Sequence, residues 1–296
     1  MKTDTNTINE LYNLISLKPD LDTIIIKGEK YSEVLKKPKS QLVQWLYCTL
    51  HTGNLSLMDN IERYHSSNLD DMISNSVKDP TLLVPAKDVK IKEVSLVEVD
   101  AVRINSKLNS EGTVCLPCFR PNLTPGFFMF VHTKSGRHGQ SVKRHYIAAD
   151  HPNYAISVWS KSITKLVKGK KLSFSGKILS NTSSYPRNDA IVFYSSEDSD
   201  KVEKILTDIV VEHPNKEMPG SLLYKKIAYN LYTAEEPIVK NGVQQSFGEN
   251  RCSAIADAIQ DHFVTNVDFK LLLKQRLKAY HIDPEDLSKN ILYSNS

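Results

Sequence analysis

The sequence predicts an α+β fold, with a mainly antiparallel sheet flanked by helices and a helical N-terminal region. Branched apolar and charged residues alternate from about Val89, in VKIKEVSLVEVDAVRINSKL, which is typical of half-exposed antiparallel strands. Before and after the strand-rich part, apolar residues recur at intervals of three and four, which indicates helices. These two patterns together give the fold class.

Residues 1–88 are expected to form a mainly helical region. The segment TIIIKG predicts one short strand, and residues 54–87, rich in Ser, Asn and Asp, predict a mobile loop with one helix. Two roles stay open for this region, because it would either recognise a leader segment of a peptide or complete the core. The residues with helical spacing are Leu11, Leu14, Ile15, Leu42, Leu46 and Leu50.

Residues 89–296 are expected to form the α+β domain. After the alternating segment at Val89, further strands are predicted in GFFMFV, SVKRHYIAA, KLSFSGKIL and DAIVFYS, separated by turns rich in Pro, Gly and Ser. Helices are predicted over residues 153–167, 200–211, 248–263 and 269–280.

Composition limits the function classes. The chain has 38 basic and 34 acidic residues, and a net charge of +4 is too small to indicate nucleic-acid binding. No apolar run approaches the roughly 20 residues of a membrane span, and the first residues lack the apolar core of a signal peptide. A cytoplasmic protein with reduced cysteines is therefore expected.

One motif has the spacing of a zinc site. Cys115, Cys118, His132 and His138 fit the pattern C-x2-C followed by H-x5-H. In a zinc finger the histidines lie on a helix, whereas here they follow the apolar strand FFMFV and enclose Gly136. We therefore expect buried or incidental thiols and no metal, with the zinc finger as the alternative.

The predicted strands carry several cations. Because side chains alternate along a strand, Lys143 and His145 point to one side of SVKRHYIAA. Arg144 and Tyr146 point to the other side, so only one pair can face a given pocket.

Two further strands follow the same rule. Lys177 lies beside Gly176, which permits a close approach of the backbone. Arg187 and Asp189 share one side at the start of their strand, where Pro186 fixes the backbone.

Arg144, Lys177 and Arg187 lie on successive strands and are expected to converge on one anion. Neighbouring strands are about 4.8 Å apart, which brings the three cations within reach of one phosphate. Like charges also favour the neutral form of a lysine, which is a base. The alternative is that these are edge-strand charges that discourage aggregation.

Arg251 belongs to a predicted helix start. Ser246 and Glu249 have the spacing of a capping box, which places Arg251 in the first turn of the helix. A cation there opposes the helix dipole and needs a partner. Either Glu235 or Glu236, or a bound anion, would provide it.

Three motifs, in this order, carry a family resemblance: RHYIAADHPNYA, YPRNDAIVFY, and AEEP…SFGENRC followed by an apolar helix. Over residues 89–263 the chain resembles the HopA-type effector family, with a weaker likeness at QWLYCTLHTGN. That family includes a type III secretion effector and the lyase component of class V lanthipeptide and thioamitide biosynthesis. The resemblance implies an α+β fold and, for the biosynthetic members, elimination of phosphate from phosphoserine or phosphothreonine in a precursor peptide.

The resemblance also implies site residues. Ala148 and Ala149 stand where relatives carry another polar residue, which removes an acid or base role there. VKRHYI is loosely similar to the Lys-x-His strand of phosphothreonine lyases, where lysine removes the α-proton and histidine protonates the leaving oxygen. The matched positions are Arg144 and Tyr146 of an Arg-x-Tyr strand, Lys177 of the sheet, Arg187 and Asp189 of Arg-x-Asp, and Arg251 of Gly-x-x-Arg-Cys.

The leading hypothesis is a phosphoserine/phosphothreonine lyase that acts on a ribosomal precursor peptide. β-Elimination needs a base and cations, but no metal, nucleotide or other cofactor. Because no kinase signature or Walker loop is present, a separate kinase would supply the phosphate. The alternative is a non-catalytic, effector-like protein that binds an acidic or phosphorylated partner.

The hypothesis assigns a role to each candidate residue. Lys177 is favoured as the base over Lys143, and Asp189 is expected to hold Arg144 or Lys177 in position. The predicted catalytic residues are Lys177, His145, Tyr146 and Asp189, and the predicted phosphate-binding residues are Arg144, Arg187, Arg251 and Lys143.

Overall fold

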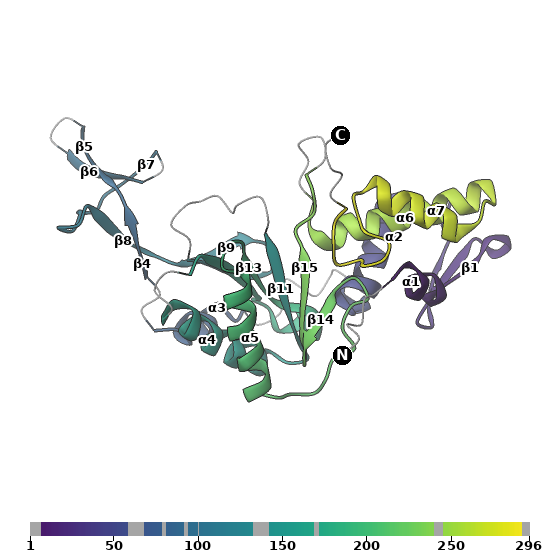
Figure 1. The fold of residues 1–296 in the computed structure, drawn as a ribbon, viewed down its shortest axis with the longest axis horizontal. Helices are drawn as coiled ribbons and strands as arrows, with labels where there is room; N and C mark the ends of the chain where they lie inside the picture. The colour runs from purple at the N-terminus through teal and green to yellow at the C-terminus, as the bar shows by residue number, and fades with distance from the viewer. Residues whose placement is uncertain are drawn as a thin grey trace.

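The computed structural model describes residues 7–58, 68–78, 81–91, 94–99, 101–132, 142–168, 172–239 and 245–291. Its centre is a seven-stranded sheet in which every neighbouring pair is antiparallel (Figure 1). The α+β prediction is confirmed. In sheet order, the strands are β14 (Lys225–Ala228), β15 (Leu231–Glu235), β11 (Lys143–Ala149), β13 (Arg187–Ser195), β12 (Phe174–Leu179), β10 (Phe127–His132) and β9 (Phe119–Thr124).

One face of the sheet is covered by α4 (Pro152–Lys168) and α5 (Ser199–Glu212), with α3 (Asp70–Asn75) beside α4. The apolar stripe of α4 packs on the inner strands through side chains such as Trp159, which is fully buried. Gly176 makes this packing possible, because an added Cβ would lie 2.9 Å from Phe193 and 3.1 Å from Trp159. Gly176 therefore makes room for core side chains.

The second group of helices lies on the right in Figure 1 and contains segments from both ends of the chain. Its members share one apolar core with the other face of the sheet. The backbone N–H of Ile8 donates to the carbonyl of Pro284 at 2.8 Å, which ties the two ends together. The group comprises α1 (Ile8–Leu14), α2 (Lys39–Leu46), the π-helical segment η2 (Tyr47–Thr52), α6 (Phe247–Thr265) and α7 (Phe269–Ala279).

The N-terminal region contains short strands as well as helices. A small antiparallel sheet follows α1 and consists of β1 (Ile15–Lys18), β2 (Thr23–Ile26) and β3 (Glu29–Ser32). The strand predicted at TIIIKG is β2, and the helix predicted within residues 54–87 is α3. The expected boundary after residue 88 falls inside β5 (Lys87–Ile91). Short 3₁₀ segments are η1 (Pro19–Leu21), η3 (Leu55–Met58) and η5 (Thr182–Ser184).

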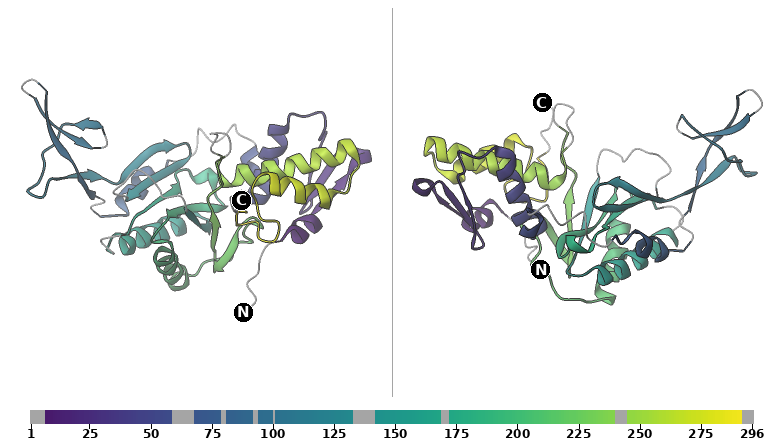
Figure 2. Two further views of the ribbon diagram at one scale, coloured as in Figure 1. Left: turned by 45° about the horizontal axis from the view of Figure 1, so that its top comes forward. Right: turned by 180° about the vertical axis from the view of Figure 1, so that it is seen from behind.

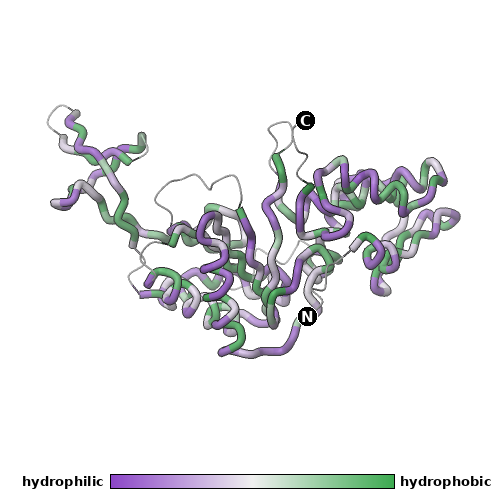
Figure 3. Tube along the Cα trace, in the orientation of Figure 1, coloured by the Kyte–Doolittle hydropathy of each residue, from purple (hydrophilic) through white to green (hydrophobic). Residues whose placement is uncertain are grey.

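An arm formed by residues 81–117 projects away from the rest of the molecule (Figures 1 and 2). Hydrophobic and hydrophilic residues alternate along it in short stretches (Figure 3), and Val84, Val97 and Val114 are buried there. The arm consists of two paired strands and, at its tip, a three-stranded sheet. These strands are β4 (Thr81–Pro85) paired with β8 (Thr113–Pro117), then β5, β6 (Val94–Val99) and β7 (Val102–Ile104).

None of the helices in the described part of the chain combines the length and hydrophobicity needed to cross a membrane.

Candidate functional site

A bulge in β13 decides which side chains face the site. Ile191 pairs with Ile147 of β11, whereas Arg187 pairs with Ala149, so three residues of β13 stand opposite one residue of β11. As a result, Ala190 and Ile191 both pack in the core under α4 and α5. The bulge leaves Arg187 and Asp189 together on the opposite face, toward α2 and α6.

Arg187 and Asp189 form a bidentate ion pair at the start of β13. Arg187 Nε donates to Asp189 Oδ1 and Nη2 donates to Oδ2, both at 2.7 Å. Burial opposes ionisation of Asp189, but the Arg187 charge and the contact with His51 outweigh it and hold the pKa of Asp189 well below its ordinary value of 3.8. The expectation that Asp189 holds Arg144 or Lys177 is wrong, because its partner is Arg187 itself.

His51 of η2 adds a second partner to this carboxylate. Its Nε2 lies 3.4 Å from Asp189 Oδ2, and its Nδ1 lies 2.7 Å from the hydroxyl of Tyr224. Burial lowers the pKa of His51, which outweighs the opposite effect of Asp189. We therefore treat His51 as neutral. Tyr224, His51, Asp189 and Arg187 are called the polar row below.

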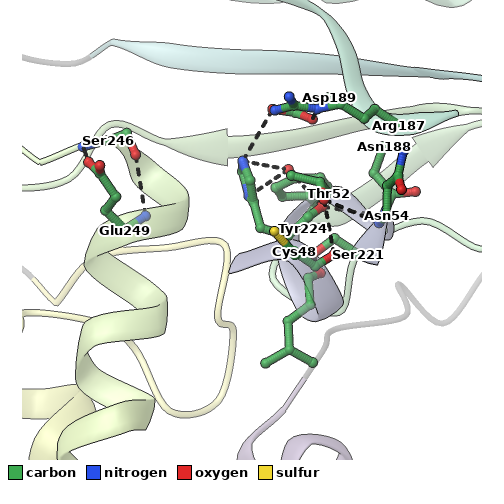
Figure 4. Close-up of polar contacts among 12 residues, drawn as sticks. Cys48, Thr52, Asn54, Arg187, Asn188, Asp189, Ser221, Tyr224, Ser246 and Glu249 are labelled. Carbon is green, nitrogen blue, oxygen red and sulfur yellow. Dashed lines mark hydrogen bonds and ion pairs between the residues drawn. The ribbon is translucent and has the colours of Figure 1, made fainter. Parts of the chain in front are cut away.

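Hydrogen bonds fasten η2 and its flanking residues to the segments around it (Figure 4). Asn188 Nδ2 donates to the carbonyl of His51 at 3.2 Å, and Asn54 Nδ2 donates to the carbonyl of Pro186 at 3.0 Å. The hydroxyl of Ser221 donates to the carbonyl of Leu50 at 2.6 Å. The position of His51 is therefore fixed from both sides.

Helix α6 approaches the site closely. The predicted capping box is present, since Ser246 N donates to Glu249 Oε2 at 2.9 Å and Glu249 N donates to Ser246 Oγ at 3.3 Å (Figure 4). A Cβ on Gly248 would lie 2.5 Å from Tyr47 and 2.7 Å from His51. Only glycine allows this approach, so Gly248 of the SFGENRC motif has a packing role.

A cleft of about 680 Å³ opens beside the polar row. Of the four residues of the row, Arg187 lines it. The Phe127 ring forms part of the same wall, and Lys177 Nζ lies 4.0 Å from its centroid, whereas Arg187 Cζ lies 5.4 Å from it. Lys177 is half-buried and has no carboxylate at ion-pair distance within the described residues. The other lining residues are Lys39, Ser40, Val43, Gln44, Tyr47, Leu57, Pro125, Gln245, Glu249 and Ser253.

Lys143 and His145 lie on the opposite face of the sheet. Lys143 Nζ is 3.2 Å from Asp200 of α5, and His145 Nε2 is 3.3 Å from Glu203 of the same helix. Alternation along β11 was predicted correctly. The grouping of these two residues with Lys177 was wrong, because the sheet itself separates them.

Arg144 is on the same face as Lys177 but does not reach Arg187. Its register partner on β13 is Tyr194, seven residues from Arg187, a separation on the order of 20 Å along the strand. Arg144 forms a bidentate ion pair with Glu236. The three strands are neighbours as expected, but the convergence of all three cations on one phosphate is contradicted.

Arg251 holds the C-terminal segment and does not line the cleft. Its guanidinium is fully buried and donates to the carbonyls of Leu287 at 3.2 Å and Lys289 at 3.0 Å, and to Asn290 Oδ1 at 2.9 Å. Burial lowers its pKa to about 9, so it stays protonated at neutral pH. The phosphate-binding role predicted for Arg251 is therefore replaced by a structural one.

Tyr146 lies behind the site. Its ring stacks on Tyr224 at 4.1 Å between centroids, and burial raises the pKa of its phenol. Ala148 and Ala149, next along β11, are fully buried. Tyr146 is 1% exposed and is absent from the cleft wall, so it supports Tyr224.

The cysteine motif lies at the base of the arm. Cys115 is exposed, Cys118 is buried, and His132 Nδ1 lies 3.0 Å from the carbonyl of Leu172. His138 lies outside the described residues. Among the residues that are described, no three His, Cys, Asp or Glu side chains are grouped so as to hold a metal ion.

Sequence reasoning gave no role to His51 and Tyr224. His51 lies in QWLYCTLHTGN, the segment with the weaker family likeness, so that likeness was the available signal. Tyr224 had no such signal, because its hydroxyl reaches His51 only through the folded chain.

The comparisons place the chain in a known family. Residues 118–288, more than half of the chain, match the model of the HopA1 effector protein family. The chain is similar to the structures of two effector proteins, from Pseudomonas syringae pv. tomato strain DC3000 (20% identity, TM-score 0.45) and pv. syringae strain 61 (21% identity, TM-score 0.45). Each match covers 56% of this chain and 63% of the effector, which is less than two thirds of its length. No curated protein matches the chain. On the family match, the chain belongs to the HopA1 effector protein family.

Proposed function

We propose that the protein is a phosphoserine/phosphothreonine lyase that eliminates phosphate from a ribosomal precursor peptide and leaves a dehydroamino acid. The observation that carries the proposal is that Arg187 and Phe127 line the cleft, and that Lys177, which is not itself a lining residue, lies over the ring of Phe127. The two cations are separated by at most the sum of their distances to the ring centroid. We propose that one phosphorylated side chain contacts both.

Arg187 is suited to bind the phosphate. A guanidinium has five N–H groups, and the ion pair with Asp189 uses two of them. The other three N–H groups remain available to an anion in the cleft. Asp189 keeps the planar group in one orientation, which favours bidentate recognition of phosphate oxygens.

Lys177 is suited to act as the base. Its neutral amine would take the α-proton, the electrons of that C–H bond would form the Cα=Cβ bond, and the Cβ–O bond would break with its electron pair on the phosphate. A substrate phosphate that carries one proton leaves as hydrogen phosphate, so the step balances without a side-chain acid. This point matters because His145, the expected acid, lies on the other face.

The reaction needs a phosphorylated precursor peptide and a separate kinase that makes it. It uses no cofactor, because lysine and arginine supply the base and the positive charge. The biosynthetic members of the family, as the sequence resemblance implies, carry out this elimination.

The experiment is incubation of the protein with phosphoserine and phosphothreonine peptides, followed by mass spectrometry and assay of released phosphate. Loss of phosphoric acid from the peptide is expected. Lys177→Ala should nearly abolish this loss while reducing peptide affinity only modestly, since Arg187 still binds the phosphate. Lys143→Ala is the matched control, because it removes a lysine from the opposite face of the same sheet and should leave turnover unchanged.

Other results would replace the proposal. Hydrolysis to the parent hydroxyl would indicate a phosphatase. Binding without conversion would support the effector-like alternative, which the pairing of Arg187 with a carboxylate favours, because such a pair can hold an anion without any chemistry. Normal elimination by Lys177→Ala would remove Lys177 from the mechanism.

A further inference from the structure

Arg187, at the end of the polar row, reaches the cleft, and the other three residues of the row are shielded from it. His51 is 4% exposed, Tyr224 is fully buried and Asp189 is 2% exposed, and none of these three lines the cleft. Arg187 is the one member of the row that does. His51 is connected to the cleft in two ways: its ring contacts Tyr47, which lines the cleft, and its Nε2 contacts Asp189, the charge partner of Arg187.

The positions of the protons in the row follow from the donors and acceptors. Asp189 is ionised and can only accept, so the His51 nitrogen that faces it, Nε2, carries the proton. Nδ1 then has the lone pair, and the Tyr224 hydroxyl donates to it at 2.7 Å. The same hydroxyl also lies 3.3 Å from Nε2 and 3.4 Å from the carbonyl of His51, so Tyr224 holds this side chain through several contacts.

His51 contacts the carboxylate oxygen that also binds Arg187. Asp189 Oδ2 lies 2.7 Å from Arg187 Nη2 and 3.4 Å from His51 Nε2. Without His51, the carboxylate would be held by Arg187 alone, and the two side chains could turn together. A second anchor on Asp189 fixes the plane of the guanidinium.

The packing around His51 makes this anchor rigid. Its ring lies 4.6 Å from the ring of Tyr47 and 5.3 Å from that of Tyr224, measured between centroids. Gly248 closes the remaining side. A side chain enclosed in this way has little freedom to change its rotamer.

We propose that His51, held by Tyr224, is a positioning residue that fixes Asp189 and so directs the three remaining N–H groups of Arg187 toward a phosphate in the cleft. The proposal rests on the proposed function for the identity of the anion. It assigns no chemical step to His51, which does not touch the substrate.

The test compares His51→Leu, which removes both polar contacts, with His51→Gln, which keeps one donor and one acceptor. Affinity for inorganic phosphate is measured by calorimetry, and KM and kcat are measured with a phosphothreonine peptide. His51→Leu should weaken phosphate binding by about tenfold or more and raise KM more than it lowers kcat. His51→Gln should recover most of the affinity.

Two further variants guard against a simple folding defect. Tyr224→Phe removes only the hydroxyl that donates to His51 and should cause a smaller loss of affinity in the same direction. Tyr232→Phe is the matched control, because it removes a hydroxyl from the same core, one that donates to the carbonyl of Met218 at 3.3 Å, and should leave phosphate affinity unchanged.

A nuclear magnetic resonance measurement separates this proposal from the proposed function. The Arg187 Nε–H signal should shift and exchange faster with solvent in His51→Leu than in the wild type, and His51→Gln should restore it. If the wild type neither binds phosphate nor eliminates it, the proposed function fails, and this signal alone decides the role of His51. An unchanged Arg187 signal in His51→Leu, or unchanged phosphate affinity where the wild type binds phosphate, would overturn the proposal.

Discussion

Replacing Asp189 with asparagine removes the counter-charge of Arg187 and keeps the shape of the side chain. Two charge-assisted hydrogen bonds of 2.7 Å join the pair, and each is worth about 1.5–3 kcal/mol. Asparagine can accept one of them, but it leaves Arg187, which is 7% exposed, as a buried charge without a partner. Breaking a buried pair in this way costs about 3–5 kcal/mol, so we expect a loss of at least 3 kcal/mol in the free energy of unfolding.

The assay is urea unfolding followed by tryptophan fluorescence, with Arg187→Met and the double variant completing a cycle. The double variant should be more stable than the sum of the single losses predicts, by about 3 kcal/mol. Asp200→Asn is the control, because this carboxylate also pairs with a cation, Lys143, but its side chain is 92% exposed, and the change should cost less than about 1 kcal/mol.

The pH dependence has a defined sign. Because folding lowers the pKa of Asp189, its contribution is present above the ordinary value of 3.8 and is lost as the pH falls through the folded pKa. The stability difference between wild type and Asp189→Asn should therefore be constant near neutral pH and shrink only below about pH 3.8. A loss under about 1 kcal/mol, or additive effects in the cycle, would show that Asp189 is not the charge partner of Arg187.

Four further results are expected. Arg187→Ala should weaken phosphopeptide binding by about 2 kcal/mol or more and leave affinity for the unphosphorylated peptide unchanged, as calorimetry can measure; equal losses for both peptides would contradict a phosphate contact. Gly248→Ala and Gly176→Ala should each destabilise the fold by about 1–3 kcal/mol, but only Gly248→Ala should reduce phosphate affinity, since its Cβ would meet His51, whereas that of Gly176 would meet Phe193. Arg251→Met should lower the free energy of unfolding by about 3 kcal/mol or more, because the carbonyls of Leu287 and Lys289 lose a charged donor, and proteolysis should then cut near residue 287 before other sites. A thermal midpoint like that of wild type would exclude this role. A chelator should leave elimination unchanged, and metal analysis should find no stoichiometric zinc; zinc that disappears with Cys115→Ala would restore the zinc-finger interpretation.

The long periodic segments were predictable, whereas several short strands, such as β14 and β15, were not. α4, α5, α6 and α7 and strands β10 to β13 carry enough apolar residues at one spacing for the pattern to be clear. β14 and β15 are four and five residues long, and the turn between them depends on Asn230 at a φ of 53°, which no periodicity signals. Strands this short are stable only because neighbours pair with them.

Part of the site was also predictable from a repeating pattern, the alternation of side chains along a strand. Alternation correctly placed Arg144 and Tyr146 opposite Lys143 and His145. It also put Arg187 and Asp189 on one side. Register along neighbouring strands is a tertiary property, so the distance between Arg144 and Arg187 was beyond the sequence pattern. The second partner of Asp189, His51, was beyond it too, because η2 meets β13 only in the folded chain.

The shared core of the two chain ends has a consequence for synthesis. Helix α1 is synthesised long before α7, yet the two helices pack together, and the N–H of Ile8 donates to the carbonyl of Pro284. These contacts span most of the chain, so the entropy of closing that loop is paid before they give any stability. When Glu235 has been added, all seven central strands exist, but α6 and Gly248, which enclose His51, do not. During translation, all strands of the central sheet are therefore present before helix α6, which encloses His51 and so helps to orient Arg187.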